Sequence, residues 1–285
     1  MQQCGAGSDL DAADTGDAPA GDRRIDGGCE PLRLRRGVKI AATGYFTAVA
    51  ATGFDRAAIV VPAHNESSAL PECLLAVLAA AARAGIPVTV VVVLDSCNDG
   101  SNALSDRFGP DVHFLEIDAR SVGAARAAGF SYARNEGVTG PTTWYATTDA
   151  DSRVDANWLV RQLSARADMV LGVVRITNWR QIPMKAVGRY LRAYHAKIQP
   201  GRVAHDHVHG ANMGFAADAY WHVGGFDALS SGEDVDLVHR FEVTGYRIRR
   251  DTRLSVATSA RQIGRAPAGF AAHLRGMLVP ERDSA

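Results

Sequence analysis

Short apolar stretches alternate with amphipathic ones along the chain from Ala57 onward. Four of these stretches are rich in β-branched residues, as expected for strands buried on both faces. The segments between them carry apolar residues every three or four positions, which is typical of helices that pack one face on a sheet. This order predicts a mostly parallel sheet with helices on both faces. The predicted strands cover 57–63, 88–94, 112–117 and 142–151, and the predicted helices cover 69–84, 101–108 and 122–137.

The second half of the chain has a weaker periodicity. Its clearest strand signal lies at 169–176, and 183–198 has the spacing of a basic amphipathic helix. We expect this half to complete the same sheet, so that the fold is a single α/β domain. The other predicted elements are helices over 156–167, 219–226 and 233–246 and a strand over 209–217.

The ends of the chain differ in composition from this domain. Gly, Ala, Asp and Ser dominate the first thirty residues, which contain too few large apolar side chains to offset the entropy of ordering. The stretch that follows is ambiguous and is compatible with a short strand or hairpin. We expect a disordered tail at 1–30, an ambiguous lead-in at 31–56, one domain at 57–260 with halves 57–151 and 152–260, and a helical tail at 261–285.

Composition places the chain among soluble globular proteins. Of its 285 residues, 47% are hydrophobic and 22% are charged. Lys plus Arg and Asp plus Glu both total 31, so no basic excess indicates a nucleic-acid partner. The most apolar stretches, 37–53 and 69–86, are interrupted by glycine or by charges, and no secretory signal opens the chain. We predict a cytoplasmic protein without a spanning segment, and a peripheral position at the inner face of a membrane stays open.

Metal-binding patterns built on cysteine or histidine are weak. The four cysteines form no CxxC pair, which favours reduced thiols over a zinc site or a disulfide framework. His205, His207 and His209 alternate, and on a strand they would share one face, as zinc ligands can. A loop with one functional histidine, best placed at His209, is the alternative.

The most informative polar group is Asp149-Ala150-Asp151, directly after a predicted strand. On a strand, residues i and i+2 face the same side, so both carboxylates would converge on one spot. Two such carboxylates repel each other unless a cation lies beside them. Mg²⁺ and Mn²⁺ take oxygen ligands and complete their shell with water and phosphate oxygens. The triplet therefore suits a metal–diphosphate site, although taken alone it fits a solvated turn slightly better.

Other motifs lie where ligands bind in parallel sheets, at the carboxyl ends of strands. VVPAHNES follows the first strand and LDSCNDGS the second, and HGANMGFAA, VGGFD and GEDVDL come after the D-x-D. In this order the motifs resemble those of family 2 glycosyltransferases with the GT-A fold, over about residues 57–255. The resemblance implies a GT-A domain with a mostly parallel central sheet, a nucleotide-binding half first and an acceptor half second.

The resemblance also implies roles for residues of the donor site. Pro62, Ala63 and Glu66 would line the nucleoside pocket, and Asp95 would hydrogen-bond the base. Arg126 matches a basic residue near the nucleotide, and a surface charge on a helix is its alternative. Asp149 would contact the ribose or the metal, Asp151 would bind the metal directly, and Asn212 would lie beside the donor sugar or the acceptor.

The implied reaction is transfer of a hexose from a UDP- or GDP-sugar to the hydroxyl of an unknown acceptor, assisted by Mg²⁺ or Mn²⁺. Glu233-Asp234 would hold the catalytic base, with Asp234 the better candidate, because inversion needs a group that takes the acceptor proton. Acids that only favour a helix start are the alternative for this pair. Asp95-Ser96 and His239-Arg240-Phe241 depart from the family pattern, and these departures leave a retaining outcome open.

Two other functions remain from the sequence. A nucleotidyltransferase acting on a sugar phosphate would use a similar sheet, but it should carry a Gly-rich basic loop after the first strand. VVPAHNESSAL contains neither glycine nor a basic residue. A non-catalytic GT-A-like module that binds a sugar or a partner stays open, although the retained acids Asp149, Asp151 and Asp234 argue against it.

Overall fold

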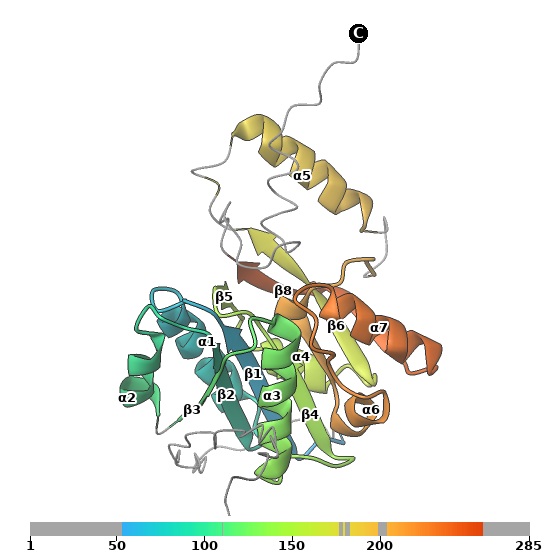
Figure 1. Cartoon of the computed structure of the whole chain (residues 1–285). Coiled ribbons are helices and arrows are strands. Elements are labelled where there is room, and N and C mark those ends of the chain that lie inside the picture. The colour runs from blue at the N-terminus through green and yellow to red at the C-terminus, as the bar shows by residue number, and fades with distance from the viewer. Residues whose placement is uncertain (1–52, 110, 177–178, 180–182, 199–203, 259–285) are drawn as a thin grey trace, which may run out of the picture. The chain divides into compact units, whose positions relative to one another are not determined.

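The computed structural model describes residues 53–109, 111–176, 179, 183–198 and 204–258 (Figure 1). All of them fall within one compact unit, residues 32–285. The predictions for 1–30 and 261–285, and for nearly all of the lead-in at 31–56, lie outside the described residues.

One sheet runs through the described part of the chain, in the strand order β3-β2-β1-β4-β7-β6-β8-β5. Strands β1 to β4 pair in parallel with one another, and β6 pairs in parallel with β8. Strand β7 runs against both β4 and β6, so these two point the same way. The strands are β1 Arg56–Ala63, β2 Val88–Asp95, β3 His113–Ile117, β4 Thr143–Thr147, β5 Ser152–Arg153, β6 Met169–Ile176, β7 Met213–Ala216 and β8 Ile248–Thr258.

Helices cover both faces of this sheet (Figure 1). Side chains of β1 alternate between the two layers, because Ile59 packs with α1 and α4 whereas Val60 packs with α3, α6 and α7. The prediction of an α/β domain with a mostly parallel sheet flanked by helices is confirmed. The helices are α1 Leu70–Arg83, α2 Leu104–Phe108, α3 Val122–Asn135, α4 Trp158–Leu163, α5 Met184–Ala196, α6 Ala217–His222 and α7 Glu233–Val243, with 3-10 turns at Ser101–Ala103 and Gly210–Asn212.

Helix α3 lies unusually close to the sheet. A Cβ atom at Gly129 would come within 2.5 Å of the Val60 side chain, so this glycine allows the close approach. Phe130, the next residue, is fully buried and stacks on Tyr145 of β4 with ring centroids 4.7 Å apart. The contact fixes α3, and with it Arg126 one turn earlier, against the centre of the sheet.

Helix α5 follows β6 and packs through a small apolar cluster of its own. Tyr190 lies against Ile176, and Trp179 and Tyr194 pack around this pair. Among the described residues, no helix has both the length and the apolar character needed to cross a bilayer.

Several predicted boundaries need correction. The strand predicted over 142–151 ends at Thr147, and the residues after it form a turn. The helix predicted over 156–167 is shorter, and 209–217 divides into a 3-10 turn, β7 and the first residue of α6. Strand β8 has no counterpart in the prediction, because IRRDTRLSVAT mixes charges with apolar residues. Residues 252–254 of β8 also bulge out of its pairing with β6, opposite the step from Gly172 to Val173.

Candidate active site

The loops after β1 and β2 bind to each other at the carboxyl edge of the sheet. The amide of Asn98 donates to Asn65 Oδ1 at 2.7 Å, and the amide of Ser67 donates to Asp99 Oδ2 at 2.8 Å. Partial burial raises the pKa of Asp99, but hydrogen bonds from Ser101 and Ser67 outweigh this and hold it well below its usual range. The two loops are therefore held together by hydrogen bonds. Pro62, Ala63 and Glu66 were predicted to line a nucleoside pocket, and all three are buried.

Asp95 has most of its hydrogen-bonding capacity filled by the protein. Its carboxylate accepts from the backbone amides of Ala119, Arg120 and Ser121 at 2.7–2.8 Å, and it is only 5% exposed. Ser121 in turn accepts from Ala124 N as the N-cap of α3. In this structure Asp95 holds the turn that opens α3, and its predicted contact with a nucleobase stays a prediction.

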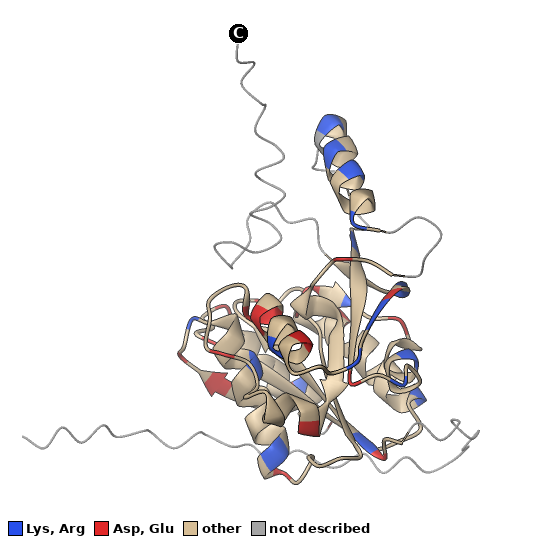
Figure 2. Cartoon of the chain, turned by 90° about the vertical axis from the view of Figure 1, so that its right-hand side faces the viewer, with Lys and Arg blue, Asp and Glu red and all other residues tan. Residues whose placement is uncertain are grey.

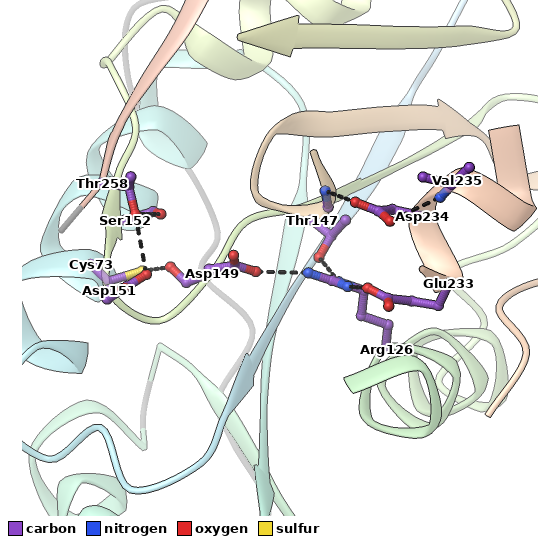
Figure 3. A network of polar contacts seen from close by, with 11 residues as sticks. Cys73, Arg126, Thr147, Asp149, Asp151, Ser152, Glu233, Asp234, Val235 and Thr258 are labelled. Atoms are coloured by element: carbon purple, nitrogen blue, oxygen red, sulfur yellow. Dashed lines mark hydrogen bonds and ion pairs between the residues drawn. The ribbon is translucent and has the colours of Figure 1, made fainter. Parts of the chain in front are cut away.

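Arg126 joins segments that are far apart in the sequence (Figure 3). From α3 it donates to Asp149 Oδ1 at 2.7 Å, to Glu233 Oε1, and to Thr147 Oγ1 at 3.3 Å. Its side chain is 2% exposed, which excludes the alternative of a surface helix charge. The guanidinium also lies 5.6 Å from the centre of the Phe226 ring. The end of β4 and the start of α7 are therefore held together by one buried cation.

A glycine makes room for this cation. A Cβ atom at Gly210 would lie 2.5–2.7 Å from the guanidinium atoms of Arg126. The amide of Gly210 donates to Asp234 Oδ2 at 2.8 Å, and Asp234 Oδ1 accepts from the amide of Val235 at 2.9 Å. The glycine of the HGAN segment thus packs on Arg126 and also binds Asp234 at the start of α7.

The acids around Arg126 are crowded. Partial burial raises the pKa of Asp149 above its usual range, Arg126 opposes the change, and the negative charges of Asp151, Glu233 and Asp234 add to it. Burial also raises the pKa of Glu233, against the effect of Arg126. Burial lowers the pKa of Arg126, but Asp149 and Glu233 outweigh it, so that the pKa lies above its usual value. The cluster therefore carries more negative charge than Arg126 neutralises.

The two acids of the D-x-D motif do not lie as predicted. Because β4 ends at Thr147, both sit in a turn closed by a 3.0 Å hydrogen bond from Ser152 N to Asp149 O. Asp149 contacts Arg126, whereas Asp151 lies beside Thr258, whose hydroxyl donates to Asp151 Oδ1 at 3.4 Å (Figure 3). The argument that both carboxylates share one face of a strand is therefore wrong, although both lie on the same turn.

Asn212 has an internal structural role. Its side chain is fully buried, its Nδ2 donates to Val173 O and Leu254 O, and its Oδ1 accepts from Trp158 Nε1. These bonds connect β6, β8 and α4. The side chain is therefore occupied by protein partners, and the position of Asn212 beside a donor sugar or acceptor stays a prediction.

The rings of the alternating histidines lie next to one another, with centroids 5.3–5.8 Å apart, but two of them are bound to backbone carbonyls. His205 Nε2 donates to Leu171 O at 3.1 Å, and His207 Nε2 donates to Tyr194 O at 3.0 Å. Within the described ranges, no three or more His, Cys, Asp or Glu side chains are grouped to hold a metal by themselves. His205 and His207 instead support the junction between β6 and α5.

Sequence reasoning missed three residues of this region. Thr147 and Thr258 contact Arg126 and Asp151, and the thiol of Cys73 donates to Asp149 O at 3.3 Å. Thr147 and Thr258 both end strands of the sheet, so the strand-end rule would have found them once β4 and β8 were bounded correctly.

Solved structures share this fold. Mannosyltransferase PcManGT from Pyrobaculum calidifontis, in complex with GDP-Man and Mn²⁺, has a TM-score of 0.57 at 20% identity, over 74% of this chain and 59% of that one. S. aureus TarS 1-349 in complex with UDP-GlcNAc gives 0.52 at 14%, over 75% and 61%. GalNAc-T7 with UDP, GalNAc and Mn²⁺ gives 0.53 at 13%, over 73% and 44%. The chain therefore spans about three fifths of the length of the first two.

Sequence comparison identifies the family. No curated protein sequence matches the chain. A profile of glycosyl transferase family 2 matches residues 58–224, which is more than half of the chain and includes Asp95, Arg126 and the D-x-D acids. Glu233 and Asp234 lie beyond the matched segment. The chain belongs to glycosyl transferase family 2 and has the GT-A-like fold of its structural neighbours.

Proposed function

We propose that this protein transfers a sugar from a UDP- or GDP-sugar to an acceptor hydroxyl, with Mg²⁺ or Mn²⁺ bound at the acids after β4. The observation that carries the proposal is the cluster around Arg126. This buried cation joins Asp149 of the D-x-D motif to Glu233 of the GEDVDL motif, which is 84 residues further along the chain. A purely structural site gains little from buried charges, since a hydrophobic replacement often serves stability equally well.

The acids present suit a hard divalent cation. Asp149 and Asp151 offer carboxylate oxygens on one turn, and the Asp149 side chain is 41% exposed. A cation held by these two acids would take its remaining ligands from donor phosphates and water, as Mg²⁺ commonly does. When bound, the metal would stabilise the negative charge of the departing diphosphate. It would also offset the surplus negative charge next to Arg126.

Asp234 is the better candidate for the base. Glu233 is buried and paired with Arg126, which makes it a positioning residue. Asp234 is half-buried, and its two oxygens accept from the amides of Gly210 and Val235. These two hydrogen bonds fix the direction of the carboxylate. Asp234 would take the proton of the acceptor hydroxyl as that hydroxyl attacks the anomeric carbon, which gives inversion.

The solved neighbours support this donor class. They were captured with GDP-Man and Mn²⁺, with UDP-GlcNAc, and with UDP, GalNAc and Mn²⁺. Family membership also counts against the alternative of a nucleotidyltransferase acting on a sugar phosphate. A non-catalytic module that binds a sugar or a partner is the function that we would propose instead if the experiment below fails.

Calorimetric titration of UDP and GDP into the full-length protein, with and without Mn²⁺, tests the donor site. We expect one nucleotide to bind in a metal-dependent manner and Asp151→Ala to weaken this binding strongly. Asp111→Ala, which removes an exposed acid outside the site, is the matched control and should bind like the wild type. If neither nucleotide binds under any metal condition, the donor site is wrong and the non-catalytic module is the better account.

A further inference from the structure

Helix α5 concentrates positive charge in a chain whose formal charge is zero. Its sequence MKAVGRYLRAYHA contains Lys185, Arg189 and Arg192 and no acid, and Lys197 follows directly. Figure 2 shows this helix with blue segments and no red one. Positions i, i+4 and i+7 fall on one side of a helix, so the three cations form a stripe.

An apolar edge runs beside this stripe. Met184 and Leu191, seven residues apart, are 79% and 39% exposed. The opposite side of the helix is the one that packs on the protein, through Val187 and Tyr190. Helix α5 therefore presents one side to the fold and turns cations and apolar side chains outward together, which is the pattern of helices that lie in a membrane interface.

A depression of about 470 Å³ lies on the outward side. Met184, Lys185, Gly188, Arg189 and Arg192 line it. Gly188 has no side chain, and the guanidinium of Arg192 lies 3.5 Å from the position that a Cβ atom would take there, so the depression is lined by three cations and one apolar side chain. This lining is complementary to an anionic headgroup whose acyl chains continue past Met184.

Helix α5 is also linked to the candidate active site. Its residue Tyr194 accepts a hydrogen bond from His207, and the two rings stack with centroids 4.5 Å apart. Three residues later, Gly210 packs on Arg126 and binds Asp234. Helix α5 follows β6, whose carboxyl end lies at the same edge of the sheet as that of β4. A surface that holds α5 would thus lie on the side of the sheet where the acids gather.

We propose that α5 docks on an anionic lipid surface, with Lys185, Arg189 and Arg192 against the headgroups and Met184 and Leu191 inserted among them. The attraction is electrostatic and hydrophobic and involves no change in covalent structure. This surface is separate from the donor site, so the proposal stands or falls independently of the nucleotide-binding experiment.

Co-sedimentation of the full-length protein with lipid vesicles is the test. We expect binding to vesicles with about one third phosphatidylserine, weakening as salt rises, and little binding to pure phosphatidylcholine. Each cation near such a surface contributes roughly fivefold to partitioning, so the K185E/R189E/R192E variant should bind at least about a hundredfold more weakly. The control R56E/R107E/R166E reverses three exposed arginines outside α5 and should bind like the wild type.

A second variant, M184S/L191S, should weaken binding without changing its dependence on salt, because it removes only the inserted apolar groups. Circular dichroism and the UDP and GDP titrations of each variant should match the wild type, which separates loss of docking from loss of fold. The proposal is overturned if the wild type ignores anionic vesicles, or if the α5 charge reversal binds them as well as the wild type does. It is also overturned if the outward face of α5 proves to join two copies of the chain, that is, if the wild type is a dimer that ignores vesicles and the α5 variants are monomers.

Discussion

Two regions of the molecule bury polar side chains, and they do so in opposite ways. Around Arg126 the groups are charged: Arg126 and Glu233 are buried, and Arg126 also pairs with Asp149, which is partly exposed. Next to α5 the buried groups are neutral histidines. Burial lowers the pKa of both His205 and His207, and their rings donate to backbone carbonyls. Neutral imidazoles are sufficient to support a helix. A cluster of charges is costly to bury, so its presence at the edge of the sheet supports the proposal that an ionic ligand binds there.

Removal of the central cation should have the largest effect. Arg126→Met leaves Asp149 and Glu233 without a partner, and breaking a buried pair in this way costs about 3–5 kcal/mol of the free energy of unfolding. Urea denaturation measures this loss, and nucleotide binding should disappear with it. As a matched control, Arg166→Met removes an exposed arginine and should leave stability unchanged. A stable Arg126→Met variant that still binds nucleotide would show that the cluster does not organise the site.

A smaller change separates chemistry from structure within the charged region. Asp234→Asn keeps an oxygen that can accept from Gly210 but removes the proposed base, so we expect sugar transfer to fall by roughly 10²–10⁴-fold. Nucleotide affinity should remain that of the wild type, and stability should fall by no more than about 1 kcal/mol, because the variant loses only the acceptor for the exposed amide of Val235. The rate at which nucleoside diphosphate is released from the sugar donor is the measurement. An unchanged rate would assign the base to another residue.

The smallest effect is expected around His205 and His207, as a dependence of the free energy of unfolding on pH. Because burial holds the folded-state pKa of His205 below its ordinary value of 6.5, the unfolded chain binds more protons as the pH falls below that value. Stability should therefore decline from about pH 6.5 downward, and His205→Gln should make this decline shallower. Denaturation curves at a series of pH values measure the slope. Equal slopes for the two proteins would mean that His205 is not held neutral by burial.

Some strands could be predicted from the sequence, whereas one strand and the hydrogen-bond partners of the site could not. Strands such as β1 and β6 are continuous apolar runs, so their positions follow from composition. Strand β8 mixes arginines with apolar residues, which hides it from any search for such runs. Hydrogen-bond partners are harder still to predict from the sequence. That Arg126 binds Glu233, 107 residues later, depends on how α3 and α7 pack. The saturation of Asn212 by Val173, Leu254 and Trp158 likewise depends on the packed core.

The proposed function requires that a divalent cation and a nucleoside diphosphate bind together at the turn after β4. An anomalous difference map from crystals grown with Mn²⁺ and the nucleotide that binds would test this directly. We predict one strong peak at about 2.1 Å from a carboxylate oxygen of Asp151, with the diphosphate on the other side of the metal. A nucleotide bound without Mn²⁺ at this turn, or Mn²⁺ bound at a different group of acids, would contradict the account.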